Sequence, residues 1–559
     1  MSQLPFNCQK QPAFGHRGVI VTNHPLATAA GCKILAAGGN GIDSAVGALL
    51  ALCVVEPMMV GIAGGGIAHI RLNTGQHVIV DGLARATATM TEDIYQPTSR
   101  DSAPPLETYS RRQDMGPSAV AVPGSLAAWC AMHRRWGKLP FSDVIDPAIH
   151  LAERGFIVTP YLENAIHEAA PDLVRDSAIS ALFLPNDRPC KAGTRLVQGD
   201  FAQSLRLIAA EGVNALHGGA LGRALATRIA TEDANAGWVT NDDLKSLTPR
   251  FYPPISGFYR GWEISGPPPP AASGVHILQM LNLMAKHDVA SMGFHSAARL
   301  HVMAEAMRTA YEDRNRFTGD PDFVDVPTMQ LVSPEYATER QTSQRPFTHP
   351  SDSSVLRESP NTTHVTLADS EGNVVSATFT INGLFGARFM VPDTGIIPNN
   401  YMMNFDPRGG TALSIAPTKR TPTSMAPMMV LRDGQLRWAL GLPGGLRIYP
   451  SAFQAIVNLI DHEMNLQSAV EAPRIWTDGQ QLEFEPLFAP QADELRKMGH
   501  DVHQVPQVGG GMNAIEVGED GCMQGAACWR ADGTVAALGG GLARTGVGFW
   551  PSIRQKGSR

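Results

Sequence analysis

Thr362 stands where the sequence changes from a polar, irregular stretch to a strand pattern, and this makes its hydroxyl a candidate nucleophile. Residues 340–361 are polar and lack hydrophobic periodicity, which indicates a mobile surface segment. Residues 364–368 and 374–380 are typical of two strands joined by a turn. Self-cleavage that exposes a new N-terminal nucleophile needs a hydroxyl residue at such a junction. The pattern also fits a plain loop-to-strand boundary, so the residues alone leave both interpretations open.

Cleavage before Thr362 would supply the base that its hydroxyl lacks. A threonine hydroxyl is a weak nucleophile until a base removes its proton. Breaking the Asn361–Thr362 bond would free an α-amine on the same residue as the hydroxyl. Such an amine has an ordinary pKa of about 7.7–8.0, so part of it is neutral near pH 7 and acts as general base. The cut predicts a large fragment, residues 1–361, and a small one, residues 362–559.

The elements that must position this threonine predict a large protein of mixed helices and strands. Residues 24–56 are typical of two helices, the second so apolar that it must be buried on most sides. Turns at residues 433–434 and 531–534 predict two further hairpins. Other strands are expected over residues 67–72, 77–80, 513–517 and 525–529, and other helices over residues 451–461 and 490–498.

Composition excludes several classes of protein. The 559 residues carry 45 Lys+Arg and 52 Asp+Glu, and this mildly acidic balance argues against a nucleic-acid partner. Seven Cys without any C-x-x-C pair argue against a disulfide framework or a cysteine-rich zinc site. The longest apolar stretch, residues 45–55, is too short to cross a bilayer. The N-terminus lacks the pattern of a secretory signal, so we expect a cytoplasmic protein, with the periplasm as the alternative.

Several motifs, in order along the chain, resemble the γ-glutamyltranspeptidase family. They are Asn361-Thr362-Thr363-His364, Thr380-Ile381-Asn382, Asn399-Asn400, Lys419-Arg420, Thr423-Ser424 and Pro443-Gly444-Gly445. This family belongs to the N-terminal nucleophile hydrolases. The resemblance implies a four-layer αββα sandwich, synthesis as an inactive precursor and autocleavage before Thr362. The two fragments would then pair as a heterodimer and form one αββα domain together.

The resemblance also implies catalytic roles. Thr362 is the expected nucleophile, and the hydroxyl of Thr380 is expected to bond to it and to assist processing. The backbone N–H groups of Gly444 and Gly445 are the expected oxyanion hole, since paired donors stabilise a tetrahedral intermediate. His364 invites a catalytic interpretation, but we expect it to be structural because the free amine already serves as base. A glycine-rich run over residues 509–514 fits a dinucleotide pattern but opens no obvious helix, and we expect neither a cofactor nor a metal.

The expected substrate contacts depart from the family at two places. Thr423 and Ser424 match positions that bind a substrate carboxylate, and Asn382 matches a further binding position. Where the family places an arginine, this chain has a leucine, and Arg85 two residues later is the candidate replacement. Asn404 stands where the family has an acidic residue that grips an α-ammonium group, so it loses about 1.5–3 kcal/mol of charge-assisted discrimination.

These departures predict an acyl group shaped like glutamate but without its amine. The acyl group would pass to Thr362 as an ester, and water or an amine acceptor would then take it. Glutaryl-cephalosporin-like amides are the expected substrates, as in the cephalosporin acylases that resemble transpeptidases, with γ-glutamyl amides and glutathione beside them. The alternatives are a glutathione hydrolase or γ-glutamyltransferase proper, an oxamate-type amidohydrolase, and an inactive homologue that binds a carboxylated ligand.

Overall fold

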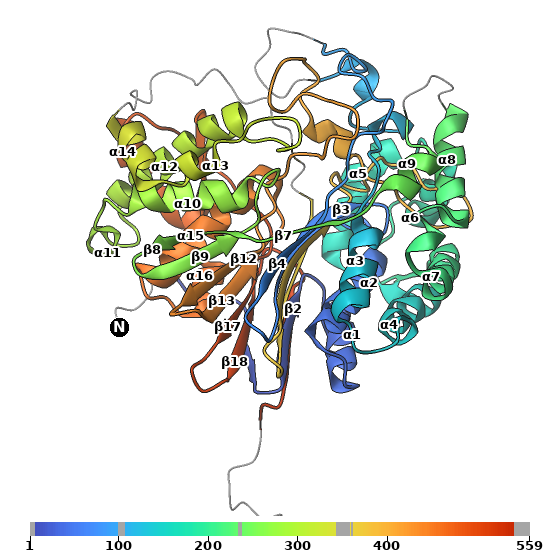
Figure 1. Cartoon of the computed structure of the whole chain (residues 1–559), viewed down its shortest axis with the longest axis horizontal. Coiled ribbons are helices and arrows are strands. Elements are labelled where there is room, and N and C mark those ends of the chain that lie inside the picture. Colours follow the sequence, from blue (N-terminus) through green and yellow to red (C-terminus); the bar gives the residue numbers. More distant parts are fainter. Residues whose placement is uncertain (1–5, 99–106, 233–237, 343–357, 359–360, 542–559) are drawn as a thin grey trace, which may run out of the picture.

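Two β-sheets stand face to face in the middle of the molecule, and helices cover the outer side of each (Figure 1). The computed structural model describes residues 6–98, 107–232, 238–342, 358 and 361–541. Three apolar clusters separate the layers, one between the sheets and one between each sheet and its helices. This is the four-layer αββα sandwich that the resemblance predicts.

The first sheet has seven strands and carries the predicted cleavage site at the start of a central strand. All of its neighbouring strands are antiparallel. In spatial order the strands are β19 (Thr534–Leu538), β2 (Gly18–Thr22), β10 (Thr363–Asp369), β11 (Val374–Thr380), β3 (Gly65–Arg71), β4 (His77–Gly82) and β7 (Arg250–Tyr252).

Helices from the first half of the chain pack on the outer face of this sheet. Residues of α2 are buried along its whole length, as its apolar sequence predicts, and a capping box from Asn40 and Asp43 begins it. The helices on this side are α1 (Pro25–Ala36), α2 (Gly41–Val55), α3 (Ser125–Trp136), α4 (Phe141–Arg154), α5 (Pro160–Leu173), α6 (Ser177–Phe183), α7 (Gly199–Glu211), α8 (Ala220–Glu232) and α9 (Asn241–Ser246).

The second sheet also has seven strands and faces the first. Its strands, in spatial order, are β1 (Ala13–Gly15), β18 (Met523–Ala527), β17 (Asn513–Val517), β13 (Gln435–Gly441), β12 (Met428–Arg432), β9 (Trp262–Gly266) and β8 (Ile255–Tyr259). The helices on its side are α10 (Ser273–Met284), α11 (Val289–Met292), α12 (Ala297–Phe317), α13 (Thr328–Leu331), α14 (Pro334–Thr342), α15 (Ile448–Ile460), α16 (Leu466–Glu471) and α17 (Ala492–Lys497).

Short elements complete the fold outside the two large sheets. They are the strands β5 (Phe156–Ile157), β6 (Arg195–Leu196), β14 (Ile475–Trp476), β15 (Gln481–Phe484) and β16 (Asp501–Gln504), with the short 3-10 helices η5 (Tyr401–Asn404), η6 (Gly445–Arg447) and η7 (Pro486–Gln491) among the connections.

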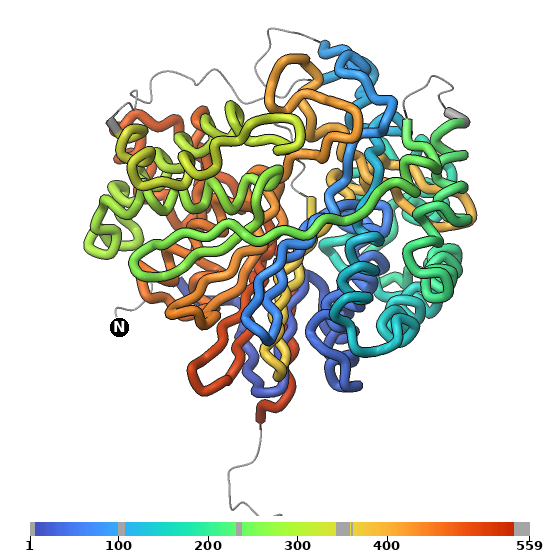
Figure 2. Tube along the Cα trace, in the orientation of Figure 1, coloured from blue at the N-terminus to red at the C-terminus, as the bar shows by residue number. Residues whose placement is uncertain are grey.

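Both sheets combine early and late segments of the chain. Figure 2 shows the trace of β2 beside those of β10 and β19, which pair with it on its two edges. In the second sheet, β9 from the first part of the chain pairs with β12 from the last part. Both sheets therefore contain strands from either side of the predicted cleavage point.

The structure corrects one predicted hairpin and adjusts some boundaries. The turn at residues 531–534 does not close a hairpin, because β18 and β19 belong to different sheets and the turn carries the chain between them. The helix expected over residues 490–498 begins with η7 and continues as α17. Most of the segment over residues 340–361, expected to be mobile, lies outside the described residues.

Among the described residues, the structure contains no helix that combines the length and the apolar character needed to cross a membrane.

Candidate active site

The carbonyl oxygen of Asn361, on the peptide bond before Thr362, accepts two hydroxyl groups. The Thr362 hydroxyl donates to this oxygen at 2.6 Å, and the Thr380 hydroxyl lies 2.8 Å from the same atom. The β10–β11 register pairs Thr363 with Phe379, which places Thr362 and Thr380 beside each other at the open end of the hairpin. Both threonines are buried. The arrangement polarises the carbonyl of the bond that the sequence predicts to be cleaved.

The Thr380 hydroxyl is oriented by its other neighbours. The backbone N–H of Asn382 donates to the Thr380 oxygen at 2.7 Å, so the hydroxyl hydrogen is left to point toward a carbonyl. Two carbonyls are within reach, those of Asn361 at 2.8 Å and Met59 at 2.9 Å. The single hydrogen of the Thr380 hydroxyl is therefore directed at the Asn361 carbonyl or at that of Met59.

The predicted oxyanion glycines form a strained turn between β13 and α15. Gly444 has φ +144° and Gly445 has φ +55°, conformations that L side chains rarely adopt. Within the described part of the chain, neither N–H group donates a hydrogen bond, so both remain available to a substrate oxygen. A Cβ on Gly444 would lie 2.9 Å from the Gly509 Cα, and the Gly510 N–H donates to Pro443 at 2.8 Å. The glycine-rich run that follows Val508 thus packs against this turn.

The predicted carboxylate-binding pair, Thr423 and Ser424, is buried beside α12. The Thr423 carbonyl accepts the N–H of Ala272 at 2.8 Å, which ties this segment to the start of α10. The Ser424 hydroxyl accepts a hydrogen bond from Arg314 at 2.7 Å, and its N–H donates to the Glu358 carboxylate at 3.0 Å. Ser424 therefore already contacts a carboxylate in the uncleaved chain.

The two predicted asparagine contacts differ in how fully they are bonded. The Asn382 amide lies 3.2 Å from both oxygens of Asn400, and its backbone has φ +77°. Asn404 in η5 donates through Nδ2 to Pro422 at 3.2 Å, while its Oδ1 has no partner among the described residues. Asn404 is only 2% exposed, and buried acceptors are normally paired. Its free oxygen is suited to accept a donor from a substrate.

The Arg85 side chain bonds to a different part of the protein from the predicted site residues described above. Its guanidinium donates to the Ser246 hydroxyl on α9 at 2.7 Å. Its backbone bridges Val122 and Arg420. Arg420 is itself occupied by buried ion pairs with Asp81 at 2.7 Å and with Asp320. The role of Arg85 as a replacement for the family's arginine stays a prediction.

His364 occupies a polar layer between the two sheets. Its ring nitrogens lie 2.8 Å from the hydroxyls of Thr378 and Thr366. Burial lowers the pKa of His364 to about 3, so the ring is neutral at physiological pH. A Cβ on Gly441 would lie 2.2 Å from the ring, which shows how closely the opposite sheet approaches. These contacts agree with the structural role expected for His364.

Glu56, which the sequence analysis missed, is a buried carboxyl group beside the predicted nucleophile, because it bonds to the adjacent Thr363. The Thr363 hydroxyl donates to Glu56 Oε2 at 2.6 Å, and Oε1 has no partner among the described residues. Burial raises the pKa of Glu56 to about 8, although the Thr363 hydrogen bond opposes the shift. A charged residue at the end of the apolar helix α2 is the sequence signal that could have identified it.

Gln113 is a second residue that the sequence did not reveal. Its Nε2 donates to the carbonyls of Met402 and Phe405, each at 2.8 Å, and so holds the turn that carries Asn404. Gln113 is fully buried, and its position 289 residues before Met402 leaves no local pattern to predict the contact.

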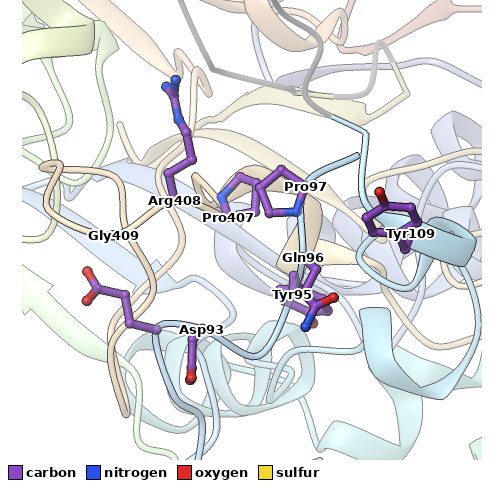
Figure 3. A pocket seen from close by; sticks show the side chains of 9 residues that line it. Asp93, Tyr95, Gln96, Pro97, Tyr109, Pro407, Arg408 and Gly409 are labelled. Atoms are coloured by element: carbon purple, nitrogen blue, oxygen red, sulfur yellow. The ribbon is translucent and has the colours of Figure 1, made fainter. Parts of the chain in front are cut away.

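A pocket of about 700 Å³ opens beside this turn (Figure 3). Two chain segments line it, one over residues 92–97 and one over residues 407–409, and Tyr109 closes one side. None of the predicted site residues lines this pocket. No group of three or more His, Cys, Asp or Glu able to hold a metal ion occurs among the described residues.

A buried threonine at the start of a central strand, with the preceding carbonyl held by two hydroxyls, within an αββα sandwich, defines the class of the N-terminal nucleophile hydrolases. The chain belongs to the γ-glutamyltranspeptidase family, because the family model "Gamma-glutamyltranspeptidase" matches residues 27–538. It is an enzyme of the amide-hydrolase type that this family comprises.

Relatives and solved structures agree with this assignment. The chain is 54% identical over 547 residues to the Acylase ACY 1 proenzyme of Pseudomonas sp. (strain SE83), covering 97% of this chain and 98% of that protein. It is 35% identical over 559 residues to the glutathione hydrolase proenzyme of Bacillus subtilis (strain 168), covering 96% and 93%. The crystal structure of cephalosporin acylase from Bacillus halodurans superposes with a TM-score of 0.85 at 28% identity, covering 96% of this chain and 98% of that one.

The raised pKa of Glu56 predicts a pH dependence of stability. Between about pH 4.5, the ordinary pKa, and about pH 8, the folded chain holds a proton that the unfolded chain has lost. Stability from this group is therefore full below pH 4.5 and is lost as the pH rises through 8. One such proton contributes a slope of at most about −1.4 kcal/mol per pH unit. We expect Glu56→Gln, in the uncleaved Thr362→Ala chain, to flatten the decline of Tm across this window.

The control is Glu335→Gln in the same chain, since Glu335 is exposed on α14. It should leave the decline of Tm with pH unchanged. A Glu56→Gln curve that runs parallel to the control curve would show that Glu56 is not protonated in the folded protein.

Proposed function

We propose that this chain cleaves itself between Asn361 and Thr362 and then hydrolyses amides of small dicarboxylic acids with Thr362 as nucleophile. The observation that carries the proposal is the Asn361 carbonyl oxygen, which accepts the hydroxyls of both Thr362 and Thr380. A hydroxyl already directed at the neighbouring carbonyl supports attack on that group. The proenzyme names of the relatives support the same processing step.

Autocleavage follows from the groups present at this bond. The Thr362 hydroxyl adds to the Asn361 carbonyl carbon, while the Thr380 hydroxyl donates to the oxygen that becomes negative. The C–N bond then breaks, its nitrogen takes the proton and an ester joins Asn361 to the Thr362 oxygen. Water hydrolyses this ester, which leaves a carboxylate on Asn361 and a free amine on Thr362. The products are residues 1–361 and 362–559.

The same hydroxyl serves in turnover. The new α-amine takes the proton of the Thr362 hydroxyl as it attacks the substrate amide, and then gives it to the leaving amine. The N–H groups of Gly444 and Gly445, which donate no hydrogen bond within the described residues, are the proposed donors to the tetrahedral oxygen. Water then releases the acyl group from Thr362, or an amine acceptor takes it. None of these steps requires a cofactor or a metal.

The proposed substrates carry a glutaryl-like acyl group, as in glutaryl-cephalosporins. Asn404 offers a neutral acceptor, Oδ1, in place of an acidic group. An acyl chain without an ammonium group therefore gives up no ion pair at this position. The similarity to an acylase proenzyme and to a cephalosporin acylase supports this choice.

Hydrolysis of γ-glutamyl amides such as glutathione is the second candidate. The unpartnered Oδ1 of Asn404 favours it, because an acceptor without a donor can bind the ammonium group of a γ-glutamyl substrate. The glutathione hydrolase proenzyme of Bacillus subtilis supports it as well. A neutral acceptor binds ammonium more weakly than a carboxylate does, so we place this activity beside the glutaryl activity.

We expect Thr362→Ala to abolish both cleavage and turnover, because the alanine lacks the attacking hydroxyl. Thr380→Val should slow cleavage by on the order of 100-fold, since it removes one donor to the developing oxyanion. Denaturing gel electrophoresis measures both, with N-terminal sequencing of the small fragment, which should begin Thr-Thr-His.

The matched control is Thr378→Val. Thr378 lies on the same strand as Thr380, and its hydroxyl contacts His364. It should process at nearly the normal rate. A fully active wild-type protein that runs as one unbroken chain would refute the mechanism, and would favour a carboxylate-binding homologue if it is also inactive.

Asn404→Asp should shift preference toward substrates that carry an amine. The aspartate would restore an ion pair with ammonium, and we expect the ratio of kcat/KM for γ-glutamyl over glutaryl anilide to rise by on the order of tenfold. The Asn400→Asp variant would control for added charge, since Asn400 already has hydrogen-bond partners in Asn382 and Asp114. A strong γ-glutamyl preference in the unaltered enzyme would contradict the interpretation of Asn404.

A further inference from the structure

Glu358, four residues before the predicted nucleophile, has its carboxylate buried against the predicted substrate-binding pair. One of its oxygens is paired with the guanidinium of Arg314, and the other accepts the Ser424 N–H at 3.0 Å. Arg314 also donates to the Ser424 hydroxyl at 2.7 Å. The Glu358 side chain is 4% exposed and that of Arg314 is 1% exposed. The guanidinium and the N–H bind the two oxygens of this carboxylate, and the Ser424 hydroxyl supports the guanidinium.

Arg314 needs an anion at this position. It extends from α12 among aromatic rings, with its guanidinium carbon 5.9 Å from the Tyr311 ring centre and 5.4 Å from that of Tyr449. Burial alone would lower the pKa of Arg314, but the Glu358 carboxylate raises it above its ordinary value. Leaving a buried charge without its partner is costly, so the loss of Glu358 favours another anion in its place.

The same carboxylate also lies near the turn that carries Asn404. Burial and then the charge of Glu358 raise the pKa of Tyr401 well above its ordinary value, and Tyr401 begins η5. Tyr449 lies near the start of α15, directly after the turn of Gly444 and Gly445. The Glu358 carboxylate therefore contacts Ser424 and Arg314 directly, and its charge acts on Tyr401 in η5.

Chain length agrees with this location. The Cα atoms of Glu358 and Thr362 are separated by at most about 14 Å, because four residues span no more when fully extended. Chain connectivity therefore limits how far Glu358 can lie from Thr362 in the uncleaved chain.

Cleavage changes how Glu358 is held. In the uncleaved chain, peptide bonds on its carboxyl side connect Glu358 to β10 within four residues, which keeps its carboxylate at a high effective concentration at Arg314. Cleavage of the Asn361–Thr362 bond removes that connection. A carboxylate in solution then competes more effectively with Glu358 for Arg314. The same bond breakage that creates the nucleophile thereby releases the internal occupant of the site.

We infer that Arg314 and Ser424 form the subsite for the substrate's free carboxylate, and that Glu358 fills this subsite until the chain is cleaved. This inference rests on the proposed function for the identity of the substrate. It assigns the guanidinium to Arg314, whereas the Arg85 guanidinium donates to Ser246.

Glutarate binding to uncleaved chains tests the exchange directly. Calorimetry on the full Thr362→Ala chain should show weak binding, because Glu358 occupies the subsite. Thr362→Ala/Glu358→Ala opens it, so the Kd for glutarate should fall by about tenfold or more. Thr362→Ala/Glu335→Ala, which removes an exposed glutamate of α14, should match Thr362→Ala. Equal Kd values in all three proteins would overturn the inference.

Adding Arg314→Gln to the Thr362→Ala/Glu358→Ala chain assigns the subsite to its guanidinium. Glutarate binding should weaken again by on the order of tenfold. Retained binding in a chain whose circular dichroism spectrum is unchanged would refute the role of Arg314. This measurement needs neither processing nor turnover, so it stands even where the variant cannot cleave itself.

Kinetics of the mature enzyme distinguish a loss of carboxylate binding from a general loss of activity. In processed Arg314→Gln, kcat/KM for glutaryl-p-nitroanilide should fall by about 10- to 100-fold, mainly through KM. Pentanoyl-p-nitroanilide, with a methyl group where glutaryl has its carboxylate, should change by less than about threefold. Equal losses on both anilides would contradict a carboxylate subsite. A wild-type enzyme that hydrolyses neither anilide would refute the proposed function, while the glutarate measurements would still decide the subsite.

Discussion

The hydrogen bonds from two threonine hydroxyls to the Asn361 carbonyl are the interaction on which the rest of the site depends. They require that β10 and β11 keep one register, because a slip of a single residue would turn every side chain to the opposite face. The register is secured on both sides, by β2 against β10 and by β3 against β11. Sheet pairing far from the scissile bond therefore determines whether the hydroxyls meet.

The predicted site includes several buried polar groups. Glu56 is a carboxyl group with a raised pKa, and Asn404 keeps an unpaired oxygen among the described residues. Arg314 is a buried cation that depends on a partner from the segment before the cut. Such groups cost stability, and they are tolerated where chemistry or ligand binding uses them. The sandwich supplies the large apolar core that offsets this cost.

The parts of the structure that were predicted from sequence are those encoded by local patterns. The hairpin of β10 and β11 and the apolar helix α2 have short-range signals. The oxyanion role of Gly444 and Gly445 came from the family resemblance and stays a prediction. The αββα architecture came from the family resemblance, since no local pattern states how sheets stack. The sequence predicts the turn at residues 531–534 correctly, but the hairpin expected there is wrong. Turn residues do not specify which strand the chain pairs with next, and β19 pairs in the other sheet.

The site residues that escaped prediction act through contacts between distant segments. Thr363 and Glu56 are 307 positions apart, and Arg314 and Ser424 are 110 apart, so no spacing rule connects them. Glu358 was the hardest of these residues to predict. It lies in a stretch whose composition indicates a mobile surface, yet its side chain is buried, because one ion pair outweighs the polar character of its neighbours.

The pairing of early with late strands in both sheets has a consequence for how the cleaved enzyme could refold. Before the cut, unfolding is an event within one molecule and can be reversed by that molecule alone. After the cut, β2 would have to find β10 and β19 on a separate polypeptide, so recovery becomes a second-order encounter that dilution slows. Folding before the bond breaks would avoid this encounter, and the lifetime of the cleaved enzyme would then depend on how slowly its two fragments separate.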